Sequence, residues 1–481
     1  MSLGNKILTG AFWSLIERVS TQIIQSILGI VLARLLSPTD YGLIGLLTVF
    51  IVISQVFIDS GFTKALIQKQ NRTQSDIYTV FVFNILISVT CYLVLWLASP
   101  FIADFYEIPQ LKILLRVLSI SLMLNSLFAV PMTLVTINLN FKLLAKVNLI
   151  TVTISGLVAI YLAYTGFGVW ALVYQTLLKS LFTVLLLWFL VKWTPKFQFS
   201  KSSFKELFSY GSKLLAGSLL NTGANNISAL LIGKVISTKQ LGYYTQGTQF
   251  TDLVFKTINS IVNKVILPTL SKIQDQKEAL VKYSKNILKT ATLFTTPIFF
   301  ILIVIAEPFI KVLLTEKWLP AVPILQIFAV ARLITIICGI NVNLLYVLGR
   351  TDITLKQQYI KIPIRLIFII AAIKFGIVYV ALGELLATTI HYFIDSYYPG
   401  KIMNYGTKDQ IKDMAPVMLL NLCLMLLSFI LMYYIPLDWL KLIATPIFYG
   451  VMCLIGMHFL KIPEYLALVK KTKEMIKRKK T

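Results

Sequence analysis

Charged residues are scarce in this 481-residue sequence, and metal-binding residues are scarcer still. Only 14% of the residues are Asp, Glu, Lys or Arg, whereas soluble domains contain about a quarter, and 57% are hydrophobic. The two histidines and the four cysteines, which form no CxxC pair, exclude a zinc site and a disulfide framework. We therefore expect no cofactor beyond a coupling ion, H⁺ or Na⁺, and a membrane protein rather than a soluble enzyme.

Motifs for nucleotide hydrolysis and metal-dependent sugar transfer are also missing. The glycine spacing from Gly242 to Gly247 is that of a P-loop, but Thr248 replaces the required lysine. No DxD sequence occurs, and no loop between the apolar runs is long enough for a catalytic domain. We expect a protein that is not an enzyme, driven by an ion gradient or by its substrate.

Long apolar runs fill most of the sequence and predict about fourteen transmembrane helices. The predicted fold class is therefore all-α and polytopic. The expected spans lie at about 8–36, 41–60, 78–98, 110–136, 147–165, 168–191, 208–236, 241–270, 287–306, 321–348, 358–375, 377–399, 414–434 and 440–460.

Lysine and arginine gather in alternate loops between these spans. One set of loops is rich in them, whereas the other set holds only Lys239, Lys311, Lys317 and Lys374. The positive-inside rule places both termini in the cytoplasm and accounts for most of the net charge of +25 without nucleic acid. The basic tail Lys470–Lys480 is expected to contact anionic membrane lipids, with nucleic-acid binding as the weaker alternative.

Shifting the sequence by 200 residues aligns two similar segments. The shift places Gly42 on Gly242 and puts one cation on another at Arg34 and Lys234. Each segment ends one helix and begins the next, so the chain is expected to contain two six-helix lobes of the same orientation. Chance similarity between apolar helices is the alternative. The expected parts are 1–200 (N-terminal lobe), 201–400 (C-terminal lobe) and 401–481 (two further helices and a basic tail).

Two helices related by this shift carry polar side chains at helical spacing. A polar stripe that faced hydrocarbon would be costly, so both stripes are expected to face a shared interior that contacts sugar. The alternative is a dry helix contact held by amide hydrogen bonds. The stripes are Ser14, Arg18, Thr21 and Gln25 on the first span, and Ser218, Asn221 and Asn225 on the seventh.

Cations outnumber acids inside the spans, where each charge costs about 2.5–3.5 kcal/mol. This excess favours a cavity that binds an anion, with Lys361 and Arg365 repelling each other at i, i+4 until the anion binds. Alternatively, Lys361 snorkels to the cytoplasmic face, and Asp252 and Lys256 neutralise each other. The expected cavity cations are Arg18, Lys179, Lys256, Arg332, Lys361 and Arg365, with Arg34 and Lys234 at the outer mouth.

Carboxylates among these cations are candidates for coupling to protons or sodium, because small changes around a buried acid shift its ionisation. Glu17 is the strongest candidate because it adjoins Arg18, although a local ion pair explains that position nearly as well. The full set is Glu17, Asp59, Asp252, Glu384 and Asp395.

Six segments carry a family resemblance: Ala33–Leu43, Phe57–Phe62, Ala65–Gln68, Pro100–Tyr106, Leu267–Gln274 and Glu316–Pro323. They resemble the Wzx-type polysaccharide flippases, in the branch for exopolysaccharides such as colanic and teichuronic acid. The resemblance covers most of the chain and implies membership of the multidrug/oligosaccharidyl-lipid/polysaccharide flippase superfamily. Relatives that flip the peptidoglycan precursor carry a Ser-Arg pair where this sequence has Glu17-Arg18.

The resemblance implies a monomeric alternating-access flippase in the bacterial cytoplasmic membrane. Its substrate would be an oligosaccharide on polyprenyl pyrophosphate, and polysaccharide polymerase machinery would be a partner. A multidrug exporter of the same fold is the first alternative, although buried cations suit organic cations poorly. A membrane polymerase or ligase is the second, although such enzymes need a larger external loop than this sequence provides.

Overall fold

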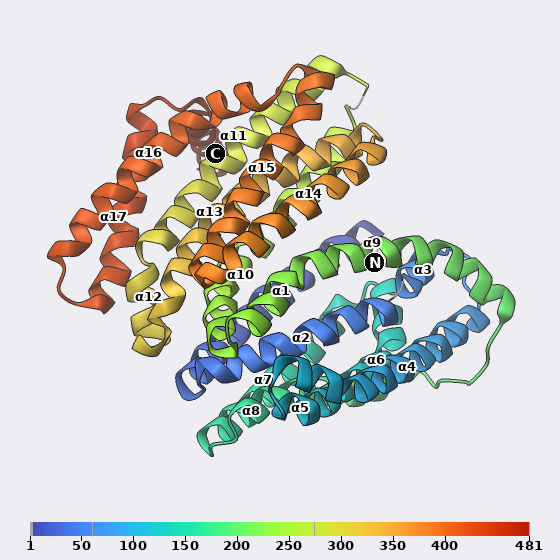
Figure 1. The fold of residues 1–481 in the computed structure, drawn as a ribbon. Coiled ribbons are helices and arrows are strands. Elements are labelled where there is room, and N and C mark those ends of the chain that lie inside the picture. The colour runs from blue at the N-terminus through green and yellow to red at the C-terminus, as the bar shows by residue number, and fades with distance from the viewer. Residues whose placement is uncertain (1–2, 60, 274, 481) are drawn as a thin grey trace. The chain divides into compact units, whose positions relative to one another are not determined.

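The computed structural model describes residues 3–59, 61–273 and 275–480. Within these residues the chain is helical and contains no strand. The chain separates into two compact units, Met1–Gly242 and Tyr243–Thr481 (Figure 1). Each unit is a bundle of long helices, coloured blue to green in the first and yellow-green to red in the second.

The first unit is formed by nine helices and the start of a tenth within the described residues. Their bounds are α1 (Leu3–Leu35), α2 (Pro38–Asp59), α3 (Phe62–Gln68), α4 (Gln74–Tyr106), α5 (Gln110–Leu118), α6 (Ile120–Ile137), α7 (Phe141–Tyr164), α8 (Val169–Val191), α9 (Lys201–Val235) and α10 (Thr238–Ser271).

The second unit contains the rest of α10, eight further α-helices and two 3₁₀ turns in the described residues. Their bounds are α11 (Lys277–Val304), α12 (Ala306–Leu313), η1 (Glu316–Ala321), α13 (Val322–Val347), α14 (Thr351–Ala372), η2 (Ile373–Phe375), α15 (Ile377–Met403), α16 (Thr407–Tyr434), α17 (Asp438–Phe459) and α18 (Pro463–Lys480).

Eleven helical segments of the described chain are long and apolar enough to cross a membrane. Three more long helices, α9, α10 and α14, fall below that apolarity, which together gives the expected number of about fourteen. These three helices carry the polar stripe on α9, Asp252 on α10, and Lys361 and Arg365 on α14. The prediction of an all-α polytopic fold is confirmed. The three long helices that are least apolar each carry candidate site residues.

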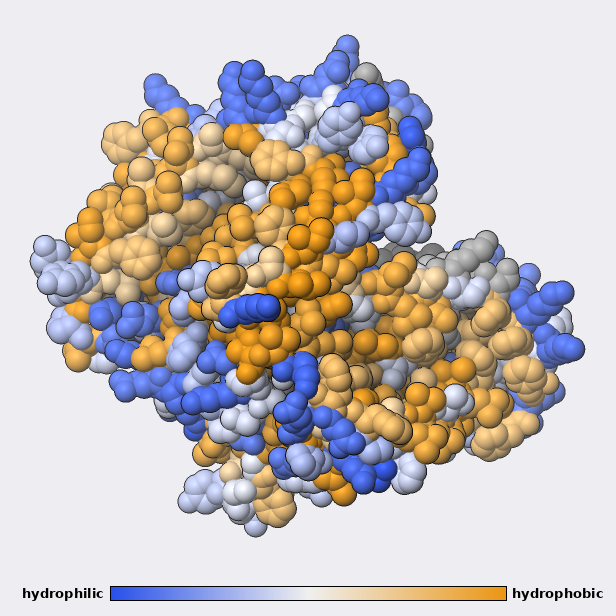
Figure 2. Space-filling model, in the orientation of Figure 1, coloured by the Kyte–Doolittle hydropathy of each residue, from blue (hydrophilic) through white to orange (hydrophobic). Residues whose placement is uncertain are grey.

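Apolar side chains cover much of the visible face of each unit, and hydrophilic side chains gather toward the helix ends (Figure 2). A water-soluble protein would bury such residues, whereas a bilayer solvates them.

The structure also contains short helices that the apolar windows of the sequence do not reveal. The span expected at 110–136 is divided at Ser119 into α5 and α6, and α3, α12 and α18 lie between or after the spans.

Close helix contacts in the first unit depend on small residues. α1 packs along α7, where Gly156 leaves room for Leu28: a Cβ on that glycine would lie 2.2 Å from the leucine side chain. α4 packs on α6, and the Ser88 hydroxyl donates to that of Ser126 across the contact at 2.9 Å. Small residues and hydroxyl hydrogen bonds are the usual means of joining helices in lipid.

α9 packs against α2, α3 and α4 and so belongs to the first unit. The lobe boundaries expected at 200 and 400 stay a prediction, since a division by compactness does not measure repeat symmetry.

The second unit is centred on α13, which packs against α11 and α15. Trp318 and Phe299 are fully buried in this part of the bundle. α17 is joined to α16 by a buried hydrogen bond of 2.8 Å from the Tyr449 hydroxyl to Asn421 Oδ1. These contacts position α14 and α15, which pack on each other and carry most of the charge inside this unit.

The repeat detected in the sequence coincides with a reciprocal contact inside the first unit. A Cβ on Gly42 would lie 1.7 Å from the Thr238 carbonyl oxygen, and a Cβ on Gly242 would lie 1.8 Å from the Pro38 carbonyl oxygen. Gly242 is the repeat counterpart of Gly42, and Thr238 is the counterpart of Pro38, so exchanging the two repeats turns one contact into the other. The first turns of α2 and α10 therefore cross at backbone distance, which only glycine permits.

Candidate substrate-binding site

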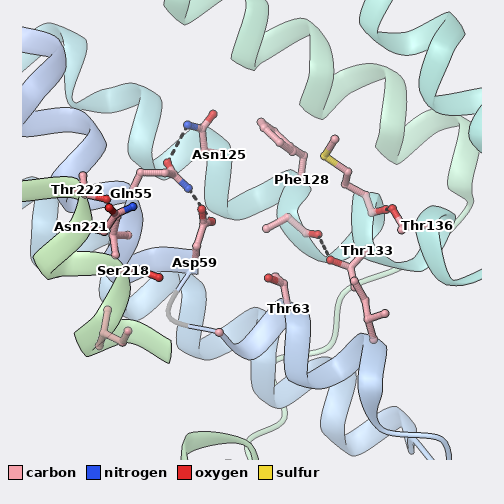
Figure 3. Close-up of a pocket in the computed structure, with 16 residues that line it drawn as sticks. Gln55, Asp59, Thr63, Asn125, Phe128, Thr133, Thr136, Ser218, Asn221 and Thr222 are labelled. Carbon is pink, nitrogen blue, oxygen red and sulfur yellow. Dashed lines mark hydrogen bonds between the residues drawn. The ribbon is translucent and has the colours of Figure 1, made fainter. Parts of the chain in front are cut away.

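A cavity of about 620 Å³ lies within the first unit among α2, α3, α6 and α9 (Figure 3). Half of its lining residues are polar but uncharged, and the apolar part of the lining includes Phe128 and Met132. The polar lining residues are Gln55, Asp59, Thr63, Asn125, Thr133, Thr136, Ser218, Asn221 and Thr222.

A chain of hydrogen bonds fixes one wall of this cavity. The Ser180 hydroxyl donates to Asn125 Oδ1 at 2.9 Å, and Asn125 Nδ2 donates to Gln55 Oε1 at 3.0 Å. Gln55 Nε2 then donates to Asp59 Oδ1 at 3.0 Å. Figure 3 shows Gln55 between Asn125 and Asp59. The chain links α8, α6 and α2, so each amide is held in one orientation.

This arrangement suits a ligand rich in hydroxyl groups. Amides and hydroxyls both donate and accept hydrogen bonds, and a carboxylate accepts from several hydroxyls at once. Phe128 adds an apolar ring surface against which a C–H face can pack. Polar groups inside a membrane protein cost free energy, so those that are present usually have a function.

The polar stripe predicted on α9 lies in part on this cavity. Ser218 and Asn221 line it, and Asn225 Nδ2 donates to Asn221 Oδ1 at 3.2 Å one turn further on. Thr222, beside the stripe, also lines the cavity. Among the candidate coupling acids, Asp59 is the one in the lining.

The stripe on α1 is not part of the cavity lining. Arg18 and Gln25 are exposed, whereas Ser14 and Thr21 are half-buried. Glu17 accepts a hydrogen bond of 2.7 Å from Asn148 Nδ2 of α7. The structure thus gives Glu17 a role in joining α1 to α7, while its role in coupling stays a prediction.

In the second unit, three of the predicted cations lie against carboxylates. Lys361 Nζ is 2.8 Å from Asp395 Oδ1, and Arg365 Nη2 is 2.8 Å from Glu384 Oε1. Arg332 of α13 is hydrogen-bonded to Asp252 of α10. Buried ions need such partners, because leaving water costs several kcal/mol per charge.

These pairs change the interpretation of α14. We expected an anion to relieve the repulsion between Lys361 and Arg365, but two carboxylates of α15 already do so. Lys361 is only 8% exposed and its ammonium contacts Asp395, so it does not snorkel to the surface. The neutralising partner of Asp252 in the structure is Arg332, which lies over Phe255 and Phe328 at 5.4 and 5.3 Å.

The remaining cations are dispersed. Lys179 of α8 is half-buried, and its side chain has no ion-pair partner among the described residues; Lys256 of α10 is exposed. Arg34 is exposed at the end of α1. Lys234 Nζ lies 2.8 Å from Glu107 Oε1 and, by this hydrogen bond, lowers the pKa of Glu107 from its usual value.

The sequence analysis missed Gln55, Asn125, Thr133 and Thr136 as site residues. Thr133 and Thr136 stand at i, i+3, and Gln55 stands four residues before Asp59, but such pairs are too short to form a stripe like those on α1 and α9. An isolated amide inside a predicted span was the available signal, because a membrane tolerates one only with a partner.

The comparisons with known proteins decide the family. The family model described as "Polysaccharide biosynthesis protein" matches residues 31–323. The chain belongs to this family. It is 29% identical over 355 residues to the teichuronic acid biosynthesis protein TuaB of Bacillus subtilis, which covers 73% of each chain. It is 25% identical over 408 residues to the lipopolysaccharide biosynthesis protein WzxC of Escherichia coli, which covers 82% of each.

Solved structures agree on the fold of this family member. The lipid II flippase MurJ, in an inward closed conformation, matches with a TM-score of 0.77 and 17% identity, over 96% of this chain and 100% of that one. An inward-facing multidrug resistance transporter of the MATE family matches with a TM-score of 0.54 and 14% identity, over 82% and 99%. The chain therefore has the fold shared by these transporters and is a multi-pass membrane protein of polysaccharide biosynthesis.

Proposed function

We propose that this protein is a flippase that moves polyprenyl-pyrophosphate-linked oligosaccharides from the cytoplasmic to the outer leaflet by alternating access. The observation that carries the proposal is the cavity of the first unit, where uncharged amides and hydroxyls line a space inside a membrane bundle. A sugar chain needs many hydrogen bonds without a fixed charge, and this lining supplies them. The names of the relatives, which refer to teichuronic acid and lipopolysaccharide, support the same substrate class.

The charged part of the substrate needs cations. Arg332 and Arg365 of the second unit suit this role because their side chains are partly open, at 25% and 18% exposure. Guanidinium groups bind phosphate oxygens in pairs. Each already contacts a carboxylate, so the pyrophosphate would compete with Asp252 or Glu384.

This competition offers a means of coupling to an ion gradient. A proton or sodium ion that neutralises Asp252 or Glu384 would release the arginine for the pyrophosphate. Binding of the ion and of the substrate would then support each other, because each removes the other's competitor. Arg18 remains a proposed phosphate contact on α1, and Lys179 and Lys256 remain proposed cavity cations.

The proposed setting is the bacterial cytoplasmic membrane, with both termini in the cytoplasm according to the distribution of lysine and arginine. A monomer contains both units and so suffices for the proposed cycle. Polysaccharide polymerase machinery would receive the flipped units.

Export of organic cations is a second candidate, favoured by one observation. The charged residue among the described lining of the first cavity is an acid, Asp59. A carboxylate attracts cationic drugs, and the MATE-family transporter shares the fold. The sugar substrate is preferred because the chain belongs to the polysaccharide biosynthesis family.

Reconstitution in liposomes distinguishes the two functions. A fluorescent oligosaccharide on polyprenyl pyrophosphate is placed in one leaflet, and its movement is followed for the native protein and for Arg18→Ala. We expect the native protein to move it and the variant to be slower. Absence of movement with several glycans, together with uptake of a cationic dye under a proton gradient, would establish the exporter instead.

A further inference from the structure

A second hollow lies in the second unit, away from the proposed substrate cavity. It is a groove of about 680 Å³ between α11, α17 and α18. Its walls are almost wholly apolar, and one lysine of α18 stands in its lining. Representative lining residues are Phe294 and Ile298 of α11, Leu454 and Met457 of α17, and Leu468 and Lys473 of α18.

α18, which supplies one wall of this groove, is held by charged contacts. Glu464, in the first turn of α18, lies 3.2 Å from Lys289 Nζ of α11. The same lysine lies 3.7 Å from Asp413 of α16. These three residues are only 12–20% exposed, so the pairs are shielded from water. They fix the start of α18 against α11.

Beyond its first turn, the described part of α18 is strongly basic. Lys470, Lys471 and Lys473 are all exposed, and Glu474 is the single acid beside them. Lys470 and Lys473 stand at i, i+3 and so share one face of the helix, where like charges repel. An anion at this face would remove that repulsion.

We propose that the groove binds an anionic phospholipid of the membrane. An acyl chain would lie against Phe294, Ile298 and Leu454, and the headgroup phosphate would lie at Lys473 and Lys470. An apolar groove with Lys473 in its lining and Lys470 one turn before it matches a lipid that carries negative charge at one end. The bound lipid would join α11, α17 and α18 and stabilise their packing.

A resident phospholipid fits this groove better than the carrier that is transported. The carrier must move its charged group across the membrane, whereas Lys473 stays in the wall of the groove because the Glu464 contact holds α18 to α11. A lipid that stays in one leaflet keeps its phosphate at that end. The groove would therefore be a site of lipid dependence and not a step of transport.

Lipid titration of the purified full-length protein in detergent tests the charge. Phosphatidylglycerol and phosphatidylcholine are titrated separately, and binding is followed by native mass spectrometry and by the melting temperature. We expect phosphatidylglycerol to bind more tightly to the native protein. The double variant Lys470→Gln/Lys473→Gln should bind it roughly thirtyfold more weakly, since each lysine near a phosphate contributes about 1 kcal/mol.

A matched control uses two other exposed lysines of the same unit. Lys408 and Lys412 stand at i, i+4 on α16 and do not line the groove. The variant Lys408→Gln/Lys412→Gln removes the same charge and should keep the native affinity for phosphatidylglycerol. Both pairs are exposed, so the melting temperature without lipid should stay close to the native value in both variants.

Filling the groove tests the acyl-chain part separately. Gly450 of α17 lines the groove, and a Cβ built on it meets no atom within 4 Å. Gly450→Leu should therefore fold and should bind both phospholipids more weakly. Gly450→Ala should bind them nearly as tightly as the native protein does. Equal affinity for the two phospholipids, or native binding by Gly450→Leu, would overturn the proposal. Displacement of phosphatidylglycerol by polyprenyl phosphate at equal concentration would also overturn it, by assigning the groove to the carrier.

Discussion

Gly42 and Gly242 stand 200 residues apart in the chain and lie against each other in the first unit, each facing the first turn of the other's helix. The backbone nitrogen of Gly242 would lie 3.1 Å from a Cβ on Gly42, and the nitrogen of Gly42 would lie 3.2 Å from a Cβ on Gly242. The near-equal distances show a local two-fold relationship between the starts of α2 and α10. The helix caps repeat as well: Asp40 N donates to Ser37 Oγ and Gln240 N to Ser237 Oγ, both at 3.2 Å.

Alanine at either glycine should disrupt this crossing. The added methyl group would overlap a carbonyl oxygen of the facing backbone, which cannot move aside as a side chain can. We expect Gly42→Ala and Gly242→Ala each to lower the free energy of unfolding by about 1–3 kcal/mol. The loss is measured as a fall in the melting temperature in detergent. Gly217→Ala is the control, because a Cβ there meets nothing within 4 Å. Native melting of both test variants would show that the helices separate freely at this point.

The buried pair of Lys361 and Asp395 should be needed for folding. Asp395 is 1% exposed, so removing it leaves an ammonium group buried without its carboxylate. Asp395→Ala should cost about 3–5 kcal/mol of stability, whereas the double variant Lys361→Met/Asp395→Leu should recover most of it. Stability is measured by thermal or denaturant unfolding of the three proteins in one detergent. If the double variant were no more stable than Asp395→Ala, the cost would come from packing and not from the charge.

The more exposed pair of Arg332 and Asp252 should respond differently. Phe255 and Phe328 keep the Arg332 guanidinium in place when the carboxylate is neutralised. Asp252→Asn should therefore tighten the binding of a polyprenyl pyrophosphate, by about fivefold or more if the competition is worth about 1 kcal/mol. Arg332→Gln should weaken it. Binding is measured by titration with the short-chain pyrophosphate; weaker binding by Asp252→Asn would contradict the proposed competition.

The sequence predicts the helices and part of the site well, because hydropathy and periodicity are local properties. Apolar windows reveal the long helices, and the 200-residue repeat reveals the two glycines before their contact is seen. The stripe with Ser218 and Asn221 appears because three polar residues, with Asn225 as the third, recur at helical spacing on α9.

The rest of the site depends on contacts between helices, which a single sequence does not record. Asn125 and Gln55 belong to the site only because α6 brings one amide to the other on α2. The sequence predicts Lys361 as a cavity cation and Asp395 as a coupling acid. It does not predict that the two residues pair, because they stand 34 residues apart on different helices. Spacing along one helix predicted repulsion with Arg365, and the neighbouring helix supplied the opposite charge.

The proposed function requires the cavity of the first unit to bind the sugar chain during flipping. The most direct test is the rate at which a fluorescent lipid-linked oligosaccharide crosses proteoliposome membranes, compared between Asn125→Ala and Ser126→Ala. Asn125 joins Ser180 to Gln55 in the cavity wall, whereas the next residue, Ser126, donates to the Met123 carbonyl and accepts from Ser88 at a contact between α4 and α6. Losing the amide leaves two polar groups without their partner, at a cost of about 1–3 kcal/mol.

We expect Asn125→Ala to flip the lipid about fivefold more slowly or slower still, while Ser126→Ala keeps a nearly native rate. Protein amounts and melting temperatures are matched between the two samples. A native rate for Asn125→Ala would contradict the role of this cavity in sugar binding, because the sugar would then cross without it.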